Sequence, residues 1–162
     1  MPDNEAERLA ALRALLILDT PPEQRFDKIV QFASTEFDVP VALITLVDAE
    51  RQWCKARVGT PVCEIGRDLS LCAHAILQPD IMVVPDTLAD ARFADNPLVS
   101  GDMNVRFYAG AQLTLASGLS LGTLCLIDHR PRTLDAMDLS ILSTLRDLAV
   151  MELGGTNAAD GA

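Results

Sequence analysis

The sequence predicts an α+β protein in which helices and loops cover the two faces of a central antiparallel sheet. Helical apolar spacing occurs near both ends of the chain, whereas apolar runs of strand length fill its middle. Short turn segments join most neighbouring strands, which favours hairpins and therefore antiparallel pairing. Helices from the two chain ends can cover one face of such a sheet and mid-chain loops the other, which makes three layers.

Two helices are predicted before the first strand. The first spans residues 5–16, where Asn4 and Glu7 have the spacing of a capping box. In the second, Thr20 has the position of an N-cap, because two prolines suit the first turn and Glu23 completes another capping box. Pro40 marks its end. The apolar stripes are Leu9, Leu12, Leu15 and Leu16 in the first helix and Phe26, Ile29, Val30, Ala33 and Phe37 in the second.

The first two predicted strands differ in their side-chain patterns. Residues 41–47 are apolar almost without interruption, as expected for a central strand covered on both faces. Residues 52–58 alternate instead, which predicts one drier and one wetter face. These faces carry Cys54, Ala56 and Val58 and, on the wetter side, Trp53, Lys55 and Arg57.

The segment that follows is less regular. Ser70 can cap a short helix over residues 71–77, and residues 81–84 have the pattern of a short strand. Turn-forming residues dominate 85–102, with a short helical turn expected after Thr87. A connection of this length between two strands is where a binding loop can lie.

A hairpin and a final helix complete the pattern. The apolar runs 105–113 and 121–128 flank Ser117-Gly118, which predicts an antiparallel hairpin. A last amphipathic helix opens at Thr133 and is expected to end at Gly154-Gly155. We therefore expect one domain over residues 1–155 and a disordered tail over residues 156–162.

Composition restricts the class of protein. The chain has 162 residues, of which 49% are hydrophobic, and a formal net charge of -10. Such a charge disfavours nucleic acid as a partner, because binding a phosphate backbone needs cationic side chains. No apolar run approaches the roughly 20 residues that span a bilayer, and the first residues lack the pattern of a secretory signal. We therefore expect a cytoplasmic protein without membrane insertion.

An ordered set of short motifs resembles the GAF family over roughly residues 5–153. The type it is similar to is the sensory GAF domain at the front of bacterial sensor histidine kinases and diguanylate cyclases. The resemblance implies a profilin-like, three-layer fold whose sheet of about six antiparallel strands has a ligand cavity under its loops. The motifs are residues 18–23, 48–53, 72–76, 84–87, 92–93, 96–99, 106–111 and 121–125.

Seven residues are the candidates for contact with a small ligand in that cavity. The guanidinium groups suit a carboxylate or phosphate, and a tyrosine offers a hydroxyl on a flat apolar ring. Asp86 could accept from a ligand amine, or could form a structural ion pair with Arg106 that braces the long loop. The candidates are Cys72, His74, Asp86, Arg92, Asn96, Arg106 and Tyr108.

Cofactor attachment at Cys72 or His74 is the next alternative. In the related phytochromes a pocket cysteine bonds a bilin and the next residue is commonly histidine, but here Ala73 separates the two. A single histidine such as His74 can hold haem iron, although the sequence gives no second cue for haem. We expect no cofactor and no metal.

An enzymatic alternative rests on Cys63 and Cys72. Their placement resembles two cysteines of the free methionine-(R)-sulfoxide reductases, which are GAF enzymes. Such chemistry needs an attacking thiolate and a resolving thiol. That family has a third, catalytic cysteine in the loop before the penultimate strand, and residues 86–104 contain none.

We therefore expect a non-catalytic sensory or regulatory domain in bacterial signal transduction, within two-component or cyclic-di-GMP signalling. A small-molecule ligand would act through the terminal helices on an attached or partner kinase or cyclase module. Those helices are also expected to form a homodimer. The reductase and a ligand-free dimerisation module are the alternatives.

Overall fold

The computed structural model describes residues 4–101 and 103–161, and for residues 155–161 only the backbone. Within these residues lies a six-stranded sheet in the order β3-β2-β1-β6-β5-β4, with every neighbouring pair antiparallel. The predicted α+β class and strand number are thus confirmed. The strands are β1 (Val41–Val47), β2 (Arg51–Val58), β3 (Glu64–Gly66), β4 (Met82–Val84), β5 (Phe107–Thr114) and β6 (Ser120–Asp128). The helices are α1 (Glu5–Ala14), α2 (Gln24–Phe37), α3 (Leu71–Ala75), α4 (Pro97–Ser100) and α5 (Ala136–Gly161), with 3-10 turns η1 (Arg67–Leu69) and η2 (Thr87–Ala89).

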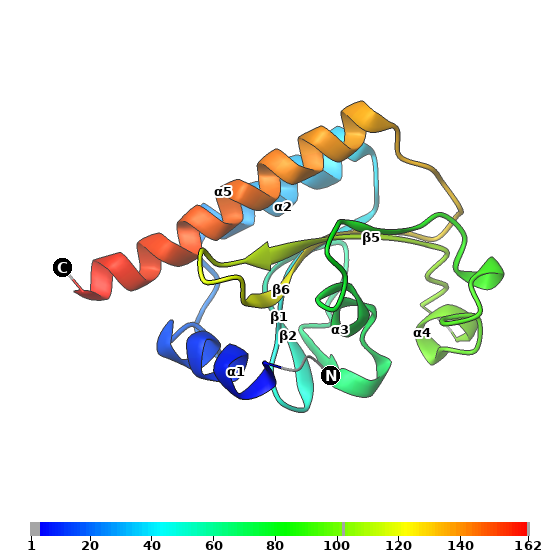
Figure 1. The fold of residues 1–162 in the computed structure, drawn as a ribbon. Helices are drawn as coiled ribbons and strands as arrows, with labels where there is room; N and C mark the ends of the chain where they lie inside the picture. The colour runs from blue at the N-terminus through cyan, green and yellow to red at the C-terminus, as the bar shows by residue number, and fades with distance from the viewer. Residues whose placement is uncertain (1–3, 102, 162) are drawn as a thin grey trace.

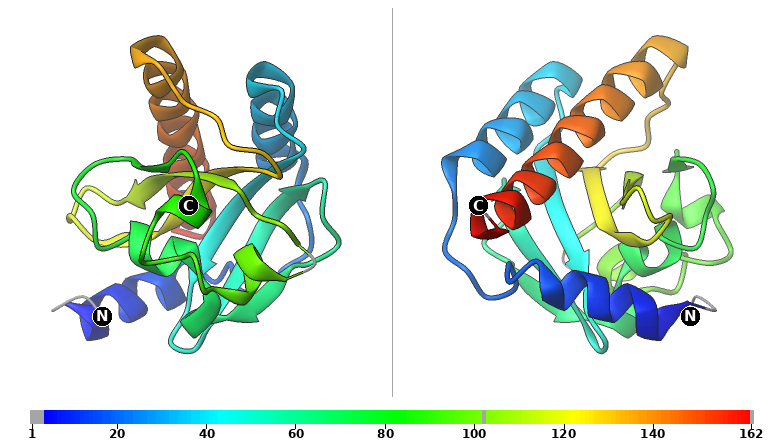
Figure 2. Two further views of the ribbon diagram at one scale, coloured as in Figure 1. Left: turned by 90° about the vertical axis from the view of Figure 1, so that its right-hand side faces the viewer. Right: turned by 60° about the vertical axis from the view of Figure 1, so that its left-hand side comes forward.

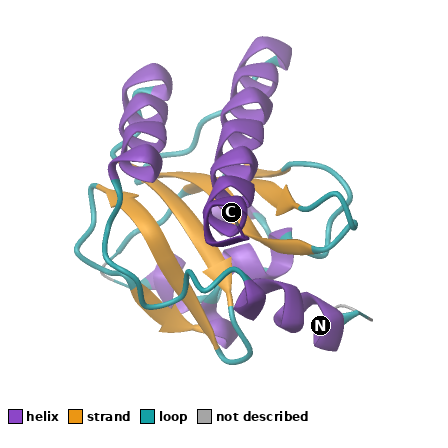
Figure 3. Ribbon diagram, turned by 90° about the vertical axis from the view of Figure 1, so that its left-hand side faces the viewer, coloured by secondary structure: helices purple, strands orange, loops and turns teal. Residues whose placement is uncertain are grey.

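The sheet separates a helical layer from a layer of loops and short helices. α2 and α5 lie side by side across one face, whereas α3, α4 and their flanking segments lie against the other (Figure 1). α1 lies apart from the helical layer, at one end of the sheet, where Arg8 donates to the carbonyl of Val47 at the end of β1 (Figure 2 and Figure 3). The long helices therefore cover one face as expected, while the first helix covers an end of the sheet.

Both faces of the sheet are buried in separate apolar clusters. On β1, Ala42, Ile44 and Leu46 belong to the cluster under α2 and α5, and Val41, Leu43 and Val47 to the cluster under the loops. This confirms that β1 is a central strand covered twice. The loop-side cluster is completed mainly by Leu71, Cys72, Phe93, Val99, Val105, Tyr108 and Cys125.

A β-bulge at Lys55 changes the predicted faces of β2. Thr45 pairs with Cys54 and Ile44 with Ala56, so Lys55 is left without a partner on β1. The extra residue reverses the alternation. As a result Trp53 and Ala56 both pack in the helix-side cluster, whereas Cys54 packs on the loop side. The prediction that Cys54 and Ala56 share a face is therefore wrong.

Lys55 also explains why the second predicted capping box does not form. Its ammonium lies 2.6 Å from a Glu23 carboxylate oxygen and donates to Thr20 Oγ1 at 2.8 Å and to the Pro21 carbonyl at 2.6 Å. A buried cation needs such partners. The side chains of Thr20 and Glu23 therefore bind the Lys55 ammonium, and α2 begins at Gln24 without a side-chain cap.

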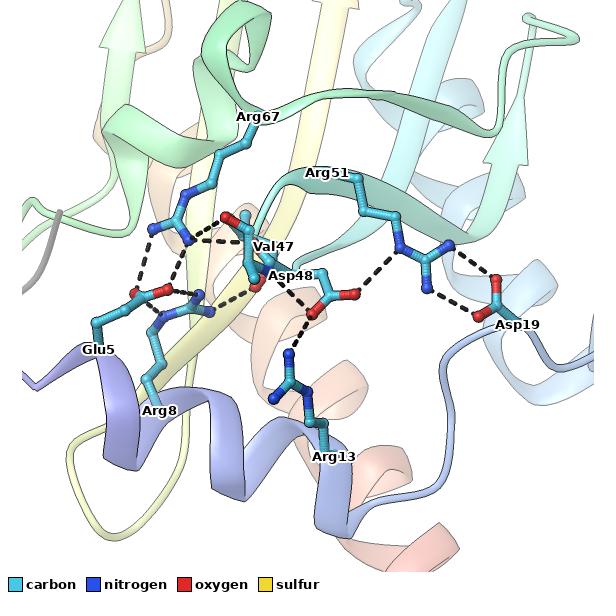
Figure 4. A network of polar contacts seen from close by, with 9 residues as sticks. Glu5, Arg8, Arg13, Asp19, Val47, Asp48, Arg51 and Arg67 are labelled. Atoms are coloured by element: carbon cyan, nitrogen blue, oxygen red, sulfur yellow. Dashed lines mark hydrogen bonds and ion pairs between the residues drawn. The ribbon is translucent and has the colours of Figure 1, made fainter.

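Charged side chains fasten α1 to the β1–β2 turn and to η1 (Figure 4). Arg8, of which only 1% is exposed, pairs with Glu5 at 2.9 Å and donates to the Val47 carbonyl at 2.7 Å. Arg67 of η1 reaches the same Glu5 carboxylate at 2.6 Å and the Asp48 carbonyl at 3.0 Å. Asn4, the other predicted cap, makes no side-chain capping bond, so α1 is held by this network and not by a capping box.

Most remaining elements agree with the sequence, but β3 and α4 are not predicted. α1 ends at Ala14 and leaves Leu16 exposed, and α5 differs from the prediction at both ends, beginning at Ala136 instead of Thr133. Ser70 accepts a hydrogen bond from the Ala73 N–H and caps α3. The hairpin of β5 and β6 turns at Gly118, whose φ of 89° is a conformation that glycine adopts readily. α5 does not end at Gly154-Gly155 but continues to Gly161. Residues 156–161, expected as a disordered tail, are helical here, and Ala162 lies outside the described residues.

The Glu5 network should make stability depend on acid pH. Burial alone would raise the pKa of Glu5, but hydrogen bonds and charge interactions with Arg67 and Arg8 outweigh it and lower the pKa to about 2. The folded state therefore binds this proton more weakly than the unfolded chain. The stabilisation is present above about pH 4.5 and is lost as the pH falls towards about 2.

Urea unfolding at a series of pH values would measure this effect. Glu5→Gln should lower the free energy of unfolding at neutral pH and flatten its decline below pH 4.5. Glu7→Gln changes an exposed side chain in the same helical turn. It should leave the dependence of the free energy of unfolding on pH as in the wild type. If the free energy of unfolding depended on pH equally in the wild type and both variants, the Glu5 network would not be the cause.

Candidate functional site

A cavity of about 60 Å³ lies on the loop-covered face of the sheet. Pockets for drug-sized ligands usually measure about 300–1,000 Å³, so this form has room for only a few non-hydrogen atoms. The predicted hollow on this face is therefore present, but small. Its apolar and sulfur-bearing wall consists of Val41, Leu43, Cys54, Val62, Ile65, Leu71, Cys72, Leu98, Met103, Val105, Tyr108, Cys125 and Ile127. The other lining residues are Gln52, Thr60, Glu64 and His129.

Cys72 is the polar centre of this wall. The hydroxyls of Tyr108 and Thr123 each donate to its sulfur at 3.1 Å. The sulfur of Cys125 lies 4.0 Å away, and Thr45 joins the cluster through its hydroxyl, 3.0 Å from that of Thr123. Strands β1, β5 and β6 thus all contribute to one buried network around a thiol carried by α3.

This network opposes the usual effect of burial on a thiol. Burial alone would raise the pKa of Cys72, but hydrogen bonds from Cys125, Thr123, Thr45 and Tyr108 together lower it to about 7. Donors aimed at one sulfur favour its thiolate. The neighbours respond in the opposite direction. The pKa of Cys125 is raised by sharing its proton with Cys72 and by burial, and burial raises the pKa of Tyr108.

Hydrogen bonds hold both ends of α3. At its start, the Ser70 hydroxyl donates to the side-chain carbonyl of Gln52 on β2 at 2.5 Å. At its end, the side-chain amide of Gln112 on β5 donates to the carbonyls of Ala75 and Asp80, at 2.8 and 2.5 Å. Because these partners lie on the sheet, they hold α3, and with it Cys72, against the cavity in this form.

Gly110 provides the space for Tyr108. The two residues lie on the same face of β5, and a Cβ at Gly110 would overlap with the hydroxyl end of the Tyr108 ring. The missing side chain therefore lets the ring lie along the strand and reach Cys72. Tyr108 is 1% exposed, so its ring has little room to move elsewhere.

Of the seven predicted site residues, Cys72 and Tyr108 line the cavity. Arg92, Asn96 and Arg106 do not, although they lie in the covering segment as expected. Arg92 is exposed, pairs with Asp90 at 2.8 Å and lies over the Phe93 ring. Arg106 donates to the Val99 carbonyl at 2.5 Å, so it braces the loop.

Asn96, Asp86 and His74 also have structural partners. Asn96 caps α4 and donates to the Leu69 carbonyl at 3.0 Å, which ties the covering segment to η1. Asp86 caps η2, and among the described residues its carboxylate forms no ion pair with Arg106. His74 packs edge-on against Phe93, with ring centroids 5.0 Å apart. Burial and the nearby Arg92 lower its pKa.

The sequence reasoning missed four polar members of the site. Thr45, Gln52, Thr123 and Cys125 all lie in strands and face the loop side, where strand alternation alone could have paired them with Cys72. The four cysteines are free thiols, and over residues 4–101 and 103–161 no group of three or more His, Cys, Asp or Glu could hold a metal ion.

This architecture defines a class: a small α+β domain with helices on one face of a sheet and a small cavity under the loops of the other. A family model described as "GAF domain" matches residues 21–153. The chain belongs to the GAF family, as the sequence predicts.

One curated relative is similar in sequence. The chain is 42% identical over 131 residues to the cyclic di-GMP phosphodiesterase PA2567 of Pseudomonas aeruginosa. The match covers 81% of this chain but 22% of that protein, so the chain spans about a fifth of the length of this relative.

Solved structures show the same fold at low identity. The GAF domain of an Acinetobacter phosphoenolpyruvate-protein phosphotransferase has a TM-score of 0.68 and 16% identity over 100% of both chains. A free methionine-R-sulfoxide reductase from Neisseria meningitidis has a TM-score of 0.68 and 14% identity over 98% of this chain and 95% of that one. The blue-light absorbing PixJ GAF domain of Thermosynechococcus elongatus has a TM-score of 0.66 and 14% identity, covering 99% and 94%.

Gly110→Ala should disturb the site specifically. The added methyl group must displace the Tyr108 ring, and we expect the free energy of unfolding to fall by about 1–3 kcal/mol. Gly154→Ala is the matched control, because its Cβ would meet nothing within 4 Å and helical Ala is favoured over Gly. Chemical unfolding of both variants measures the difference. A Gly110→Ala variant as stable as the control would contradict the close packing described.

Proposed function

We propose that this chain is a sensory GAF domain that binds a small, uncharged ligand in the cavity beside Tyr108. The observation that carries the proposal is the lining of that cavity, which is apolar apart from a few groups, among them one phenol and the buried thiols. None of the described arginine or lysine side chains lines it. A buried anionic ligand would lack a cationic partner, so an uncharged one is favoured over the anion that the arginines suggested.

Binding would shift the domain between two arrangements. A ligand that exceeds about 60 Å³ requires α3 and the segment from Pro85 to Arg106 to move outward. The ligand can favour this open arrangement over the closed one only by the difference in its affinity for the two arrangements. We propose that α3 passes this movement through Arg67 to α1, and that the sheet passes it to α2 and α5.

The output belongs, in this proposal, to bacterial signal transduction in the cytoplasm. A relative named as a cyclic di-GMP phosphodiesterase supports a role in cyclic-di-GMP signalling, with a kinase, cyclase or phosphodiesterase module as the attached or separate partner. None of the described helices has the length and hydropathy of a bilayer-spanning segment.

The reductase alternative has less support. Cys63 is exposed and does not line the cavity, whereas Cys72 is buried in its wall. The two thiols that the reductase hypothesis needs therefore do not lie in one site: one is in solvent and the other is in the cavity wall. We propose that the domain acts without catalysing a reaction.

A homodimer is the second proposal. Phe32 on α2 and Met137, Leu148 and Met151 on α5 are 53%, 68%, 45% and 69% exposed. Single exposed apolar residues are common, but these gather on the two helices that form one layer. We propose that two copies pair through α5.

Native mass spectrometry of freshly purified protein tests ligand binding. We expect a bound mass of small-molecule size that is lost on unfolding. Ile127→Phe fills the cavity from its partly exposed edge and should remove that mass, whereas Ile81→Phe, outside the cavity, should retain it. Retention in both variants would place the ligand elsewhere.

Light scattering tests the dimer. Replacing Leu148 and Met151 together by Glu should convert a dimer into a monomer without loss of fold, because both side chains are exposed. Leu88→Glu, 53% exposed on η2 at the opposite layer, is the control and should remain dimeric. A wild-type protein that is monomeric at all concentrations would overturn the proposal.

A further inference from the structure

Cys72 and Cys125 form a thiol pair in the cavity wall to which the proposed ligand binding assigns no covalent chemistry. Their sulfur atoms lie 4.0 Å apart in the cavity wall. A disulfide bond is about 2.05 Å long, so the two atoms need to approach by roughly 2 Å. Cys125 is fixed in the middle of β6, whereas Cys72 lies on a five-residue helix that is packed onto the sheet. A small movement of α3 would supply the approach.

The surroundings give the two thiols different chemical roles. Tyr108 and Thr123 donate to Cys72, and the lowered pKa of Cys72, about 7, makes it the better nucleophile. The raised pKa of Cys125 keeps that residue a thiol that shares its proton with Cys72. An attacking sulfur and a second sulfur beside it are what a two-step oxidation requires.

We propose that a small hydroperoxide entering the cavity oxidises Cys72, and that Cys125 then closes a reversible disulfide with it. The Cys72 sulfur attacks the peroxide, the O–O bond breaks, and sulfenic acid and water, or the corresponding alcohol, are formed. The Cys125 sulfur then attacks the Cys72 sulfur, and the S–O bond breaks; the departing hydroxide takes the Cys125 proton and leaves as water. The pair loses two electrons and two protons, which reduce the peroxide.

Access and selectivity both follow from the cavity. Its volume of about 60 Å³ is enough for a molecule of a few atoms, such as hydrogen peroxide, and exposed residues such as His129 lie at its edge. Cys54 also lines the cavity, but burial raises its pKa to about 12. Cys63 is exposed outside the cavity. The proposal therefore selects one pair among four thiols.

Disulfide formation would alter the cavity without any ligand. A sulfur bonded to Cys125 is no longer the acceptor that holds the Tyr108 and Thr123 hydroxyls in their present positions. The phenol and α3 would rearrange together. Oxidation would thus act on the same helix that a ligand would move, and through a separate chemical input.

Hydrogen peroxide treatment of the whole chain, followed by alkylation and intact-mass and peptide analysis, tests this. Before alkylation, the intact mass of the wild type should fall by about 2 Da. Alkylation should then modify two of its four thiols, and digestion should yield a peptide that links Cys72 to Cys125. Cys125→Ser should stop at the sulfenic acid of Cys72, trapped as a diketone adduct. Cys54→Ser and Cys63→Ser are the controls and should form the same linkage as the wild type.

Three results would overturn the proposal. They are a linkage of Cys54 to Cys63, disulfides only between chains through Cys63, and four thiols still reduced when free cysteine at the same peroxide concentration is oxidised. The wild-type peptide map decides among them without any variant, so failure of a serine variant to fold does not affect the outcome. None of these measurements depends on a bound ligand.

Discussion

The structure depends on one constraint: both faces of its sheet are apolar and must be covered. Every residue of β1 is buried, with alternate side chains entering opposite clusters. Long helices can cover one face closely, as α2 and α5 do. The chain between β2 and β5 covers the other with short elements that do not match its surface throughout. A cavity on that face follows from the mismatch, and small strand residues such as Gly110 and Cys125 help to shape it.

The same constraint explains what could be predicted from sequence. β1, the β5–β6 hairpin and the Ser70 cap depend on neighbouring residues, so their patterns are visible in the chain. The bulge at Lys55 depends on a buried ammonium that takes its partners from residues 20–23, far away in sequence. The N-cap preference of threonine favours Thr20 as a helix cap, but the buried ammonium of Lys55 has the stronger requirement for a partner.

The arginines and Asn96 illustrate a second reason for misplaced sites. An irregular covering segment leaves backbone carbonyls without strand or helix partners, and these need donors. Arg106 supplies one to Val99, and Asn96 supplies one to Leu69. Polar residues in such a segment therefore resemble ligand contacts in sequence, while their bonds hold the segment together. Many of the residues that line the cavity are instead uncharged strand residues such as Leu43 and Cys125, which sequence patterns treat as core.

α3 is the element on which these interactions converge. Gln52 and Gln112 hold its ends, and Tyr108 and Thr123 hold its thiol, so displacing it breaks several hydrogen bonds of about 1 kcal/mol each. In the proposed switch, a ligand or a disulfide would have to offset that cost, which would make movement of α3 selective. The 3-10 turn directly before α3 carries Arg67, whose guanidinium shares the Glu5 carboxylate with the buried Arg8. In the proposed relay, a displaced α3 would therefore pull on a salt bridge that holds α1, so the route from the cavity would lead to the N-terminal helix as directly as to α5.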